Sequence, residues 1–229
     1  ERGDRQHDPD CPFCRGNESK TGKEIARVNN PVGEWDVRCI PNKFPVLRIE
    51  GDIDETREGL YWRMNGIGAH EVLIETPFHD EMLSDLPVNR YTSLFLLYKE
   101  RIIDLTRDKR FRYVLIFKNH GVQAGQLISH SHSQIVALPF VPSRLRQELQ
   151  NSRVLFETDG HNLFCDLIKQ ESEQHVRVID ENELYIAICP YASRAPFEVW
   201  ILPKRHNARF EEEDEKSLEL LAFVFSRTL

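Results

Sequence analysis

The sequence predicts a mixed α+β fold, and three observations support this class. Six short runs are rich in Val, Ile and aromatic residues, which is typical of strands. One longer segment has apolar residues at helical spacing. A sequence pattern also recurs at a long interval, which indicates two related halves. The 229 residues, 40% of them hydrophobic, suffice for a sizeable core, as one domain or as two small ones.

The expected elements follow from local pattern. Strands are predicted over residues 35–40, 70–75, 112–117, 134–138, 184–188 and 197–202. An amphipathic helix is predicted over residues 89–106, where leucine, tyrosine and isoleucine repeat on one face. Shorter helices are predicted over 142–150 and 212–226, and the acidic run 211–215 suits the start of the latter.

The repeat divides the chain into two expected domains. Glu-Val-Leu-Ile at 71–74 precedes His79, and Glu-Val-Trp-Ile at 198–201 precedes His206 at the same interval. Residues 162–165 similarly echo residues 11–14. We therefore expect a catalytic half over residues 1–150 and a related half over 151–229. Counted from His206, the interval between His79 and His130 ends beyond Leu229, so the second half is expected to be incomplete.

The segment His-Ser-His-Ser-Gln at 130–134 contains the strongest candidate for chemistry. Alternation along a strand places His130, His132 and Gln134 on one face. An imidazole is nucleophilic near neutral pH because its pKa is about 6.5. A neighbouring amide can donate a hydrogen bond to a phosphoryl group. A metal-binding strand face is the open alternative, since imidazole is also the commonest zinc-binding side chain.

A glycine-containing loop precedes this strand. Gly121 and Gly125 allow backbone N–H groups to approach an anion closely, and Asn119 offers a side-chain donor. Two glycines alone usually indicate only a turn. Beside two strand histidines, however, they favour a phosphate-binding loop.

Cysteine usage suggests both a compartment and a metal. The five cysteines are an odd number and no apolar leader is present, which favours a reduced, cytoplasmic setting. Cys11 and Cys14 form a Cys-x-x-Cys pair, typical of half a zinc site or of a redox pair. Zinc is preferred here because only polar residues, and no predicted strand, come before the pair.

The charge and hydropathy of the sequence restrict the kinds of binding partner that are expected. With 30 basic and 37 acidic residues, the net charge is −7, so no nucleic-acid surface is expected. The sequence has no long apolar span, so no membrane anchor is expected either.

The motif His-x-His-x-Gln, preceded by Phe-x-Asn-x-Gly at 117–121, resembles the galactose-1-phosphate uridylyltransferase family of the histidine-triad superfamily. The form Ser-His-Ser-His-Ser-Gln is closer to the ADP-glucose phosphorylase-like branch. The resemblance runs from Cys11 to about Phe210. It implies duplicated histidine-triad-like halves, each an antiparallel sheet with flanking helices, and a homodimer.

The resemblance also implies metal sites. Structural Zn²⁺ would be bound by the four side chains of Cys11, Cys14, His79 and His130. His79 considered alone would be an ordinary surface histidine. A candidate second metal has two open pairings, Glu148 with His206 or Cys165 with His206. Asn162 stands where the second pairing would have another cysteine, and Glu148 also suits a solvated helix.

The nucleotide would contact several residues in family positions: Asn42, Phe44, Phe13, Asn119, Gly121 and Gly125. Two departures weaken this expectation. Lys43 replaces an acidic residue expected at the ribose, and Leu127 replaces a serine expected at a phosphate.

The implied chemistry is nucleotidyl transfer. His132 would attack the α-phosphorus of a nucleotide sugar, with Gln134 stabilising the phosphoryl oxygens. The acceptor would be a hexose 1-phosphate, as in a UDP-glucose:hexose-1-phosphate uridylyltransferase of galactose metabolism. An ADP-glucose phosphorylase using inorganic phosphate is the alternative. A histidine-triad hydrolase and a zinc-stabilised nucleotide-binding module without turnover also remain open.

Overall fold

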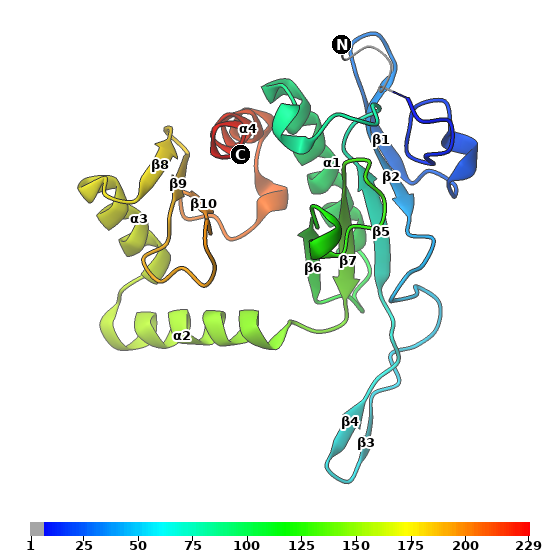
Figure 1. Ribbon diagram of the computed structural model, residues 1–229. Coiled ribbons are helices and arrows are strands. Elements are labelled where there is room, and N and C mark those ends of the chain that lie inside the picture. The colour runs from blue at the N-terminus through cyan, green and yellow to red at the C-terminus, as the bar shows by residue number, and fades with distance from the viewer. Residues whose placement is uncertain (1–6) are drawn as a thin grey trace. The chain divides into compact units, whose positions relative to one another are not determined.

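The computed structural model describes residues 7–229 and divides into two compact units (Figure 1). One unit comprises the described residues up to Leu86 together with Leu96–Val141, and the other comprises Pro87–Phe95 with Pro142–Leu229. Strands in each unit pair antiparallel, and helices flank them, so the predicted mixed α+β class is confirmed. None of the helices in residues 7–229 has the length and apolar character that a membrane span requires.

The first unit is built on a five-stranded antiparallel sheet with the order β1-β2-β5-β7-β6. The strands are β1 (Ala26–Asn29), β2 (Trp35–Pro41), β5 (Ala69–Ile74), β7 (His132–Leu138) and β6 (Tyr113–Phe117). The central pair β5–β7 places Ile74 opposite His132 and Val72 opposite Gln134. On the other side of β7, Phe117 of β6 also pairs with Gln134. The two candidate catalytic side chains therefore project from the middle of the sheet.

Helix α1 (Val88–Leu105) packs on the face of this sheet opposite to His132 and Gln134. The part of the helix that does so begins at Leu96 and belongs to the first unit. The Tyr98 hydroxyl lies 2.7 Å from Ser133 Oγ, and Arg101 binds Glu71 through two hydrogen bonds of 2.8 Å. Ser133 alternates with His132 and Gln134 along β7, so α1 leaves their face to the loops. On that face, Phe13 from the loop at 11–14 packs with Ile40 of β2 and with Val72 and Ile74 of β5.

A small two-stranded hairpin extends from the first unit (Figure 1). It consists of β3 (Thr56–Glu58) and β4 (Tyr61–Arg63), paired antiparallel. Short 3₁₀ turns complete the connections: η1 (Glu18–Lys20), η2 (Leu83–Asp85), η3 (Val122–Ala124) and, in the second unit, η4 (Phe210–Glu212).

The second unit has a three-stranded antiparallel sheet in the order β10-β9-β8. Its elements are α2 (Ser143–Asp159), α3 (Leu163–Gln174), β8 (Val178–Glu181), β9 (Tyr185–Ile188), β10 (Trp200–Pro203) and α4 (Glu215–Thr228). Alternate residues of β9 supply two cores: Ile186 and Ile188 pack with Ile168 of α3, and Tyr185 and Ala187 pack with Val224 of α4.

The structure differs from the predicted elements in several places. The helix expected over 142–150 continues to Asp159, and α3, β1, β8 and the β3–β4 hairpin were not predicted. Helix α3 begins where Asn162 accepts a hydrogen bond from the Cys165 N–H, so residues 163–165 are helical, whereas residues 11–14 form a turn. His130 lies just before β7, and Phe13 contacts its ring as well as that of His132, with centroids 6.0 and 5.4 Å away.

Candidate active site and metal centre

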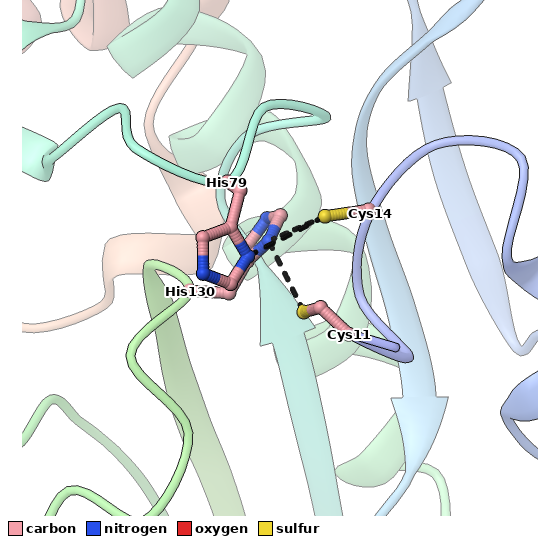
Figure 2. A group of neighbouring side chains, drawn as sticks. All are labelled: Cys11, Cys14, His79 and His130. Atoms are coloured by element: carbon pink, nitrogen blue, oxygen red, sulfur yellow. Dashed lines mark hydrogen bonds between the residues drawn. The ribbon is translucent and has the colours of Figure 1, made fainter. Parts of the chain in front are cut away.

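Four side chains converge beside the N-terminal end of β7 (Figure 2). The possible ligand atoms of Cys11, Cys14, His79 and His130 all lie within 4.8 Å of one another. His130 Nδ1 is 3.6 Å from both sulfur atoms, and His79 Nδ1 is 3.5 Å from Cys14 Sγ. The structure thus brings together the four residues expected to bind zinc, from three separate loops.

The loop that carries the two cysteines is held by one buried amide. The Asn17 Nδ2 group donates to the carbonyl oxygens of Asp8, Pro9 and Cys11, at 2.9, 3.2 and 2.7 Å. Cys14 Sγ also accepts the Asp8 N–H at 3.4 Å. These contacts fix the turn that places both thiols on the same side of the loop.

The backbone determines how His130 presents its ring. Its Nε2–H donates to the Thr76 carbonyl at 2.7 Å, so the Nδ1 lone pair faces the two sulfur atoms. This outer hydrogen bond is the arrangement usual for a metal-binding histidine. Burial lowers the pKa of His130 to about 4 and raises the pKa of the Cys14 thiol. A cation bound here therefore meets a neutral imidazole and displaces a thiol proton.

The backbone of His130 orients the ring of His132. Its Nδ1–H donates to the His130 carbonyl at 2.8 Å, so Nε2 has the free lone pair of the neutral ring. Burial lowers the pKa of His132, which favours this neutral form. The edge-on ring of Phe13, with centroids 5.4 Å apart, limits how His132 can rotate. The neutral ring therefore presents the Nε2 lone pair as its acceptor.

An ion pair not anticipated from the sequence supports the start of β7. The Lys118 ammonium donates to Glu75 Oε2 at 2.6 Å, to Ser131 Oγ at 3.0 Å and to the His132 carbonyl at 3.1 Å. Ser131 Oγ in turn donates to Glu75 at 2.6 Å. Glu75 is fully buried. This network lies directly behind the backbone of His132 and immobilises it.

Gln134 lies beside two polar side chains from neighbouring segments. Its Oε1 is 2.8 Å from His70 Nε2 and 3.2 Å from Asn42 Nδ2. Asn42 Oδ1 accepts the Phe44 N–H at 2.9 Å. Asn42, which was expected to contact the nucleotide, therefore reaches Gln134 directly. His70 was not identified from the sequence.

The two aromatic residues expected at the nucleotide have different environments. Phe13 is buried in the cluster between the metal loop and the sheet. Phe44 is 77% exposed, and the Lys43 ammonium lies 5.7 Å from its ring centroid. Phe44 is thus available to stack against a planar group, and Lys43 adds positive charge beside it.

The glycine loop after β6 is closed by internal hydrogen bonds. Gly121 and Gly125 both have positive φ, 82° and 86°, as only glycine readily adopts. The Gly121 N–H donates to Gln126 Oε1 at 2.6 Å, and the Gly125 N–H donates to the Val122 carbonyl at 3.0 Å. A phosphate bound by these N–H groups would have to replace those bonds. Asn119 lies close to Gly125, within the same loop.

The candidate second metal residues are only partly brought together. Cys165 Sγ is 3.6 Å from His206 Nδ1, but Asn162 Nδ2 also lies 3.3 Å from that nitrogen and can donate to it. Glu148 forms an exposed ion pair with Arg144 in α2. Among residues 7–229, the cluster of three or more His, Cys, Asp or Glu side chains suited to a metal is the one at Cys11.

The chain is similar in sequence to known proteins. The model for "Galactose-1-phosphate uridyl transferase, N-terminal domain" matches residues 1–142. The chain is 35% identical over 213 residues to the ADP-glucose phosphorylase of Arabidopsis thaliana, covering 92% of this chain and 59% of that protein. It is 28% identical over 211 residues to the galactose-1-phosphate uridylyltransferase of Thermotoga maritima, covering 90% and 62%. It therefore spans about three fifths of the length of these relatives.

Solved structures show the same similarity. A crystal structure of an Arabidopsis thaliana ADP-glucose phosphorylase with bound ADP-glucose superposes with a TM-score of 0.84 at 33% identity, covering 96% of this chain and 67% of that one. A uridylyltransferase structure gives a TM-score of 0.79 at 31% identity, with coverage of 96% and 67%.

Proposed function

Because the chain belongs to the galactose-1-phosphate uridyl transferase family, we propose that it contains the catalytic histidine of a nucleotidyltransferase acting on nucleotide sugars. The observation that supports this most directly is the orientation of His132. Its Nδ1–H is held by a backbone carbonyl, its Nε2 lone pair is free, and Gln134 lies on the same strand face.

The proposed reaction has two displacements. His132 Nε2 attacks the α-phosphorus of the nucleotide sugar, and the bond to the bridging oxygen breaks, so that sugar 1-phosphate leaves with that oxygen. A phosphate oxygen of the acceptor then attacks the nucleotidyl-histidine and releases the ring. The Gln134 NH₂ group donates to the phosphoryl oxygens as negative charge develops on them.

Two acceptors distinguish the candidate activities. A hexose 1-phosphate acceptor with a uridine nucleotide would make the protein a UDP-glucose–hexose-1-phosphate uridylyltransferase, as its family membership suggests. Inorganic phosphate with an adenine nucleotide would make it an ADP-glucose phosphorylase. Its 35% identity to such an enzyme and the TM-score of 0.84 favour this second activity enough to require a direct comparison.

We propose Zn²⁺ as the ion held by Cys11, Cys14, His79 and His130. Two thiolates and two imidazoles are a typical tetrahedral zinc set, and four protein ligands leave no position for substrate. The ion would therefore be structural. It would fix the loop containing Phe13 and the carbonyl of His130, both of which contact His132.

The test uses the natural full-length protein and nucleotide sugars labelled at the α-phosphorus. UDP-glucose and ADP-glucose are each offered with hexose 1-phosphate, with inorganic phosphate or without acceptor. We expect acid-labile label on the protein without acceptor, and its transfer when the correct acceptor is added. His132→Asn should abolish labelling, whereas the exposed His161→Asn should leave it unchanged.

Other outcomes would contradict the proposal in defined ways. Label that persists in His132→Asn would exclude this nucleophile. Release of nucleoside monophosphate by water, without an acceptor, would indicate a hydrolase. Saturable binding that is lost on denaturation, without covalent label, would indicate a binding module. The same preparation also tests the expected homodimer by sedimentation.

A further inference from the structure

We infer that His70 is a positioning residue that holds the amide of Gln134 in the orientation required for phosphoryl transfer, an inference that rests on the proposed function. His70 is the second residue of β5 and is half-buried. It contacts the segment containing Asn42 on one side and Gln134 on the other.

The protonation of the His70 ring follows from a backbone contact. The Val46 N–H lies 3.2 Å from His70 Nδ1, and a backbone N–H can only donate. Nδ1 must therefore be the acceptor, and the proton of the neutral ring is on Nε2. Nε2 is 2.8 Å from Gln134 Oε1, so it donates to that oxygen.

A second backbone contact fixes Asn42 in the same way. The Phe44 N–H donates to Asn42 Oδ1 at 2.9 Å, so the other end of this amide is its NH₂ group. That group lies 3.2 Å from Gln134 Oε1 and 3.0 Å from His70 Nε2. Both nitrogen atoms are donors, and they lie close together because they share one acceptor oxygen.

The two donors together determine which way the Gln134 amide faces. A reversed amide would point its NH₂ group at two other donors and lose both hydrogen bonds. Gln134 therefore keeps Oε1 toward His70 and Asn42, and its NH₂ group is the end available to a phosphoryl oxygen. The residues that set this orientation are themselves anchored by the backbone at Phe44 and Val46. Binding of a nucleotide by this segment would thus be coupled to the position of Gln134.

The test uses the different reach of two amide side chains. Glutamine at position 70 can place an amide N–H near the position of Nε2, whereas asparagine can replace only Nδ1 and its contact with Val46. We expect His70→Asn to slow nucleotidyl transfer roughly 10- to 100-fold, the range that misplacement of a catalytic group produces. His70→Gln should restore most of the rate, and nucleotide-sugar affinity should change less than the rate in both variants.

A double-mutant cycle with Gln134→Ala separates positioning from a general structural role. If His70 acts through Gln134, His70→Asn should cause little further loss in the Gln134→Ala protein. Equal losses in both backgrounds, or equal losses for His70→Asn and His70→Gln, would overturn the inference. The control is His175→Asn, at an exposed position with φ of 52°, where asparagine is well tolerated.

A measurement independent of activity completes the test. Long-range ¹H–¹⁵N NMR of the imidazole rings reports the tautomer of His70, and Nε2–H is expected. An Nδ1–H tautomer would overturn the inference even if the protein transfers label normally. Wild-type protein that takes no label would instead overturn the proposed function, and with it any role of His70 in transfer.

Discussion

Three histidines of the first unit differ in chemistry because different backbone groups contact them. The Thr76 carbonyl holds Nε2–H of His130 and leaves Nδ1 for a metal. The His130 carbonyl holds Nδ1–H of His132 and leaves Nε2 for the proposed attack on phosphorus. The Val46 N–H makes Nδ1 of His70 an acceptor and leaves Nε2–H as a donor. One residue type thus supplies the proposed metal ligand, the proposed nucleophile and the proposed positioning donor.

The metal centre yields a prediction at the residue scale. Cys14→Ser should remove bound zinc, because a serine hydroxyl does not ionise near neutral pH and is a poor zinc ligand. The melting temperature should also fall, by roughly 2–4 °C for each kcal/mol lost. Metal analysis by mass spectrometry and calorimetry would measure both. The exposed Cys189→Ser is the control, and full zinc content in Cys14→Ser would contradict the ligand assignment.

At the scale of elements, one face of β5 and β7 carries the candidate active site and the other face packs against α1. His132 and Gln134 project from one face of β7, whereas Ser133 and Ile135 project toward α1. The neighbouring strand β5 repeats this division, with His70 on the first face and Glu71 on the second. Packing on α1 therefore stabilises the sheet without occupying the candidate active site.

The buried ion pair between α1 and β5 should be essential for this packing. Arg101 donates twice to Glu71, and the Cys39 thiol donates to the same carboxylate at 3.1 Å. Arg101→Met would leave the carboxylate buried without a counter-charge, which costs about 3–5 kcal/mol. Chemical denaturation would measure the change. Exposed Arg107→Met should alter the free energy of unfolding by less than about 0.5 kcal/mol, and a similarly small effect for Arg101→Met would contradict the argument.

The second unit has a pH-sensitive contact before α4. Burial opposes ionisation of Glu213, but hydrogen bonds from Arg205 and Asn207 prevail and hold the pKa of that carboxyl below its usual range. The contact should therefore contribute full stability above the unfolded pKa, about 4.3, and lose it as the pH falls through the lower folded value.

Glu213→Gln should reveal this contribution. The variant should be less stable than wild type by about 1.5–3 kcal/mol near neutral pH, the value of a hydrogen bond to a charged group. Its stability should also change less than that of wild type on acidification below pH 5. Denaturation at a series of pH values measures both effects, and parallel pH profiles would contradict the assignment. Exposed Glu219→Gln serves as the control.

At the scale of the whole molecule, the proposed zinc ligands all belong to one compact unit. Cys11, Cys14, His79 and His130 lie within the unit that contains β1, β2, β5, β6 and β7. The second unit has cores of its own around β9. Loss of the ion should therefore affect the two units unequally.

Chelation of the metal tests whether its loss affects the first unit more than the second. Amides of the loop at 8–17 and of β7 should lose protection from hydrogen exchange, since His130 fixes the start of that strand. Amides of β9 and α4 should keep their protection. Added zinc should restore the protection lost in the loop and in β7. Equal loss of protection in both units would show that the ion supports the whole molecule.

The sequence by itself determined the features that depend on neighbouring residues. Alternating and β-branched residues located β2, β5, β7 and β9 to within two residues. The His-x-His-x-Gln spacing placed His132 and Gln134 on one strand face, because side chains alternate along any strand. The resemblance to a known family, rather than spacing, suggested that His79 and His130 join the two cysteines.

Only the tertiary structure decided the roles that depend on distant partners. His70 is 24 residues from Val46 and 64 from Gln134, so its hydrogen bonds exist only once β5 pairs in register with β2 on one side and β7 on the other. Lys118 and Glu75 are 43 residues apart, so their ion pair likewise could not be predicted from local sequence. The start of α3 was missed for a different reason, since its Asn162 cap is a local contact that the sequence pattern did not single out. A side chain's partners, and hence its tautomer and charge, are set by the folded backbone around it.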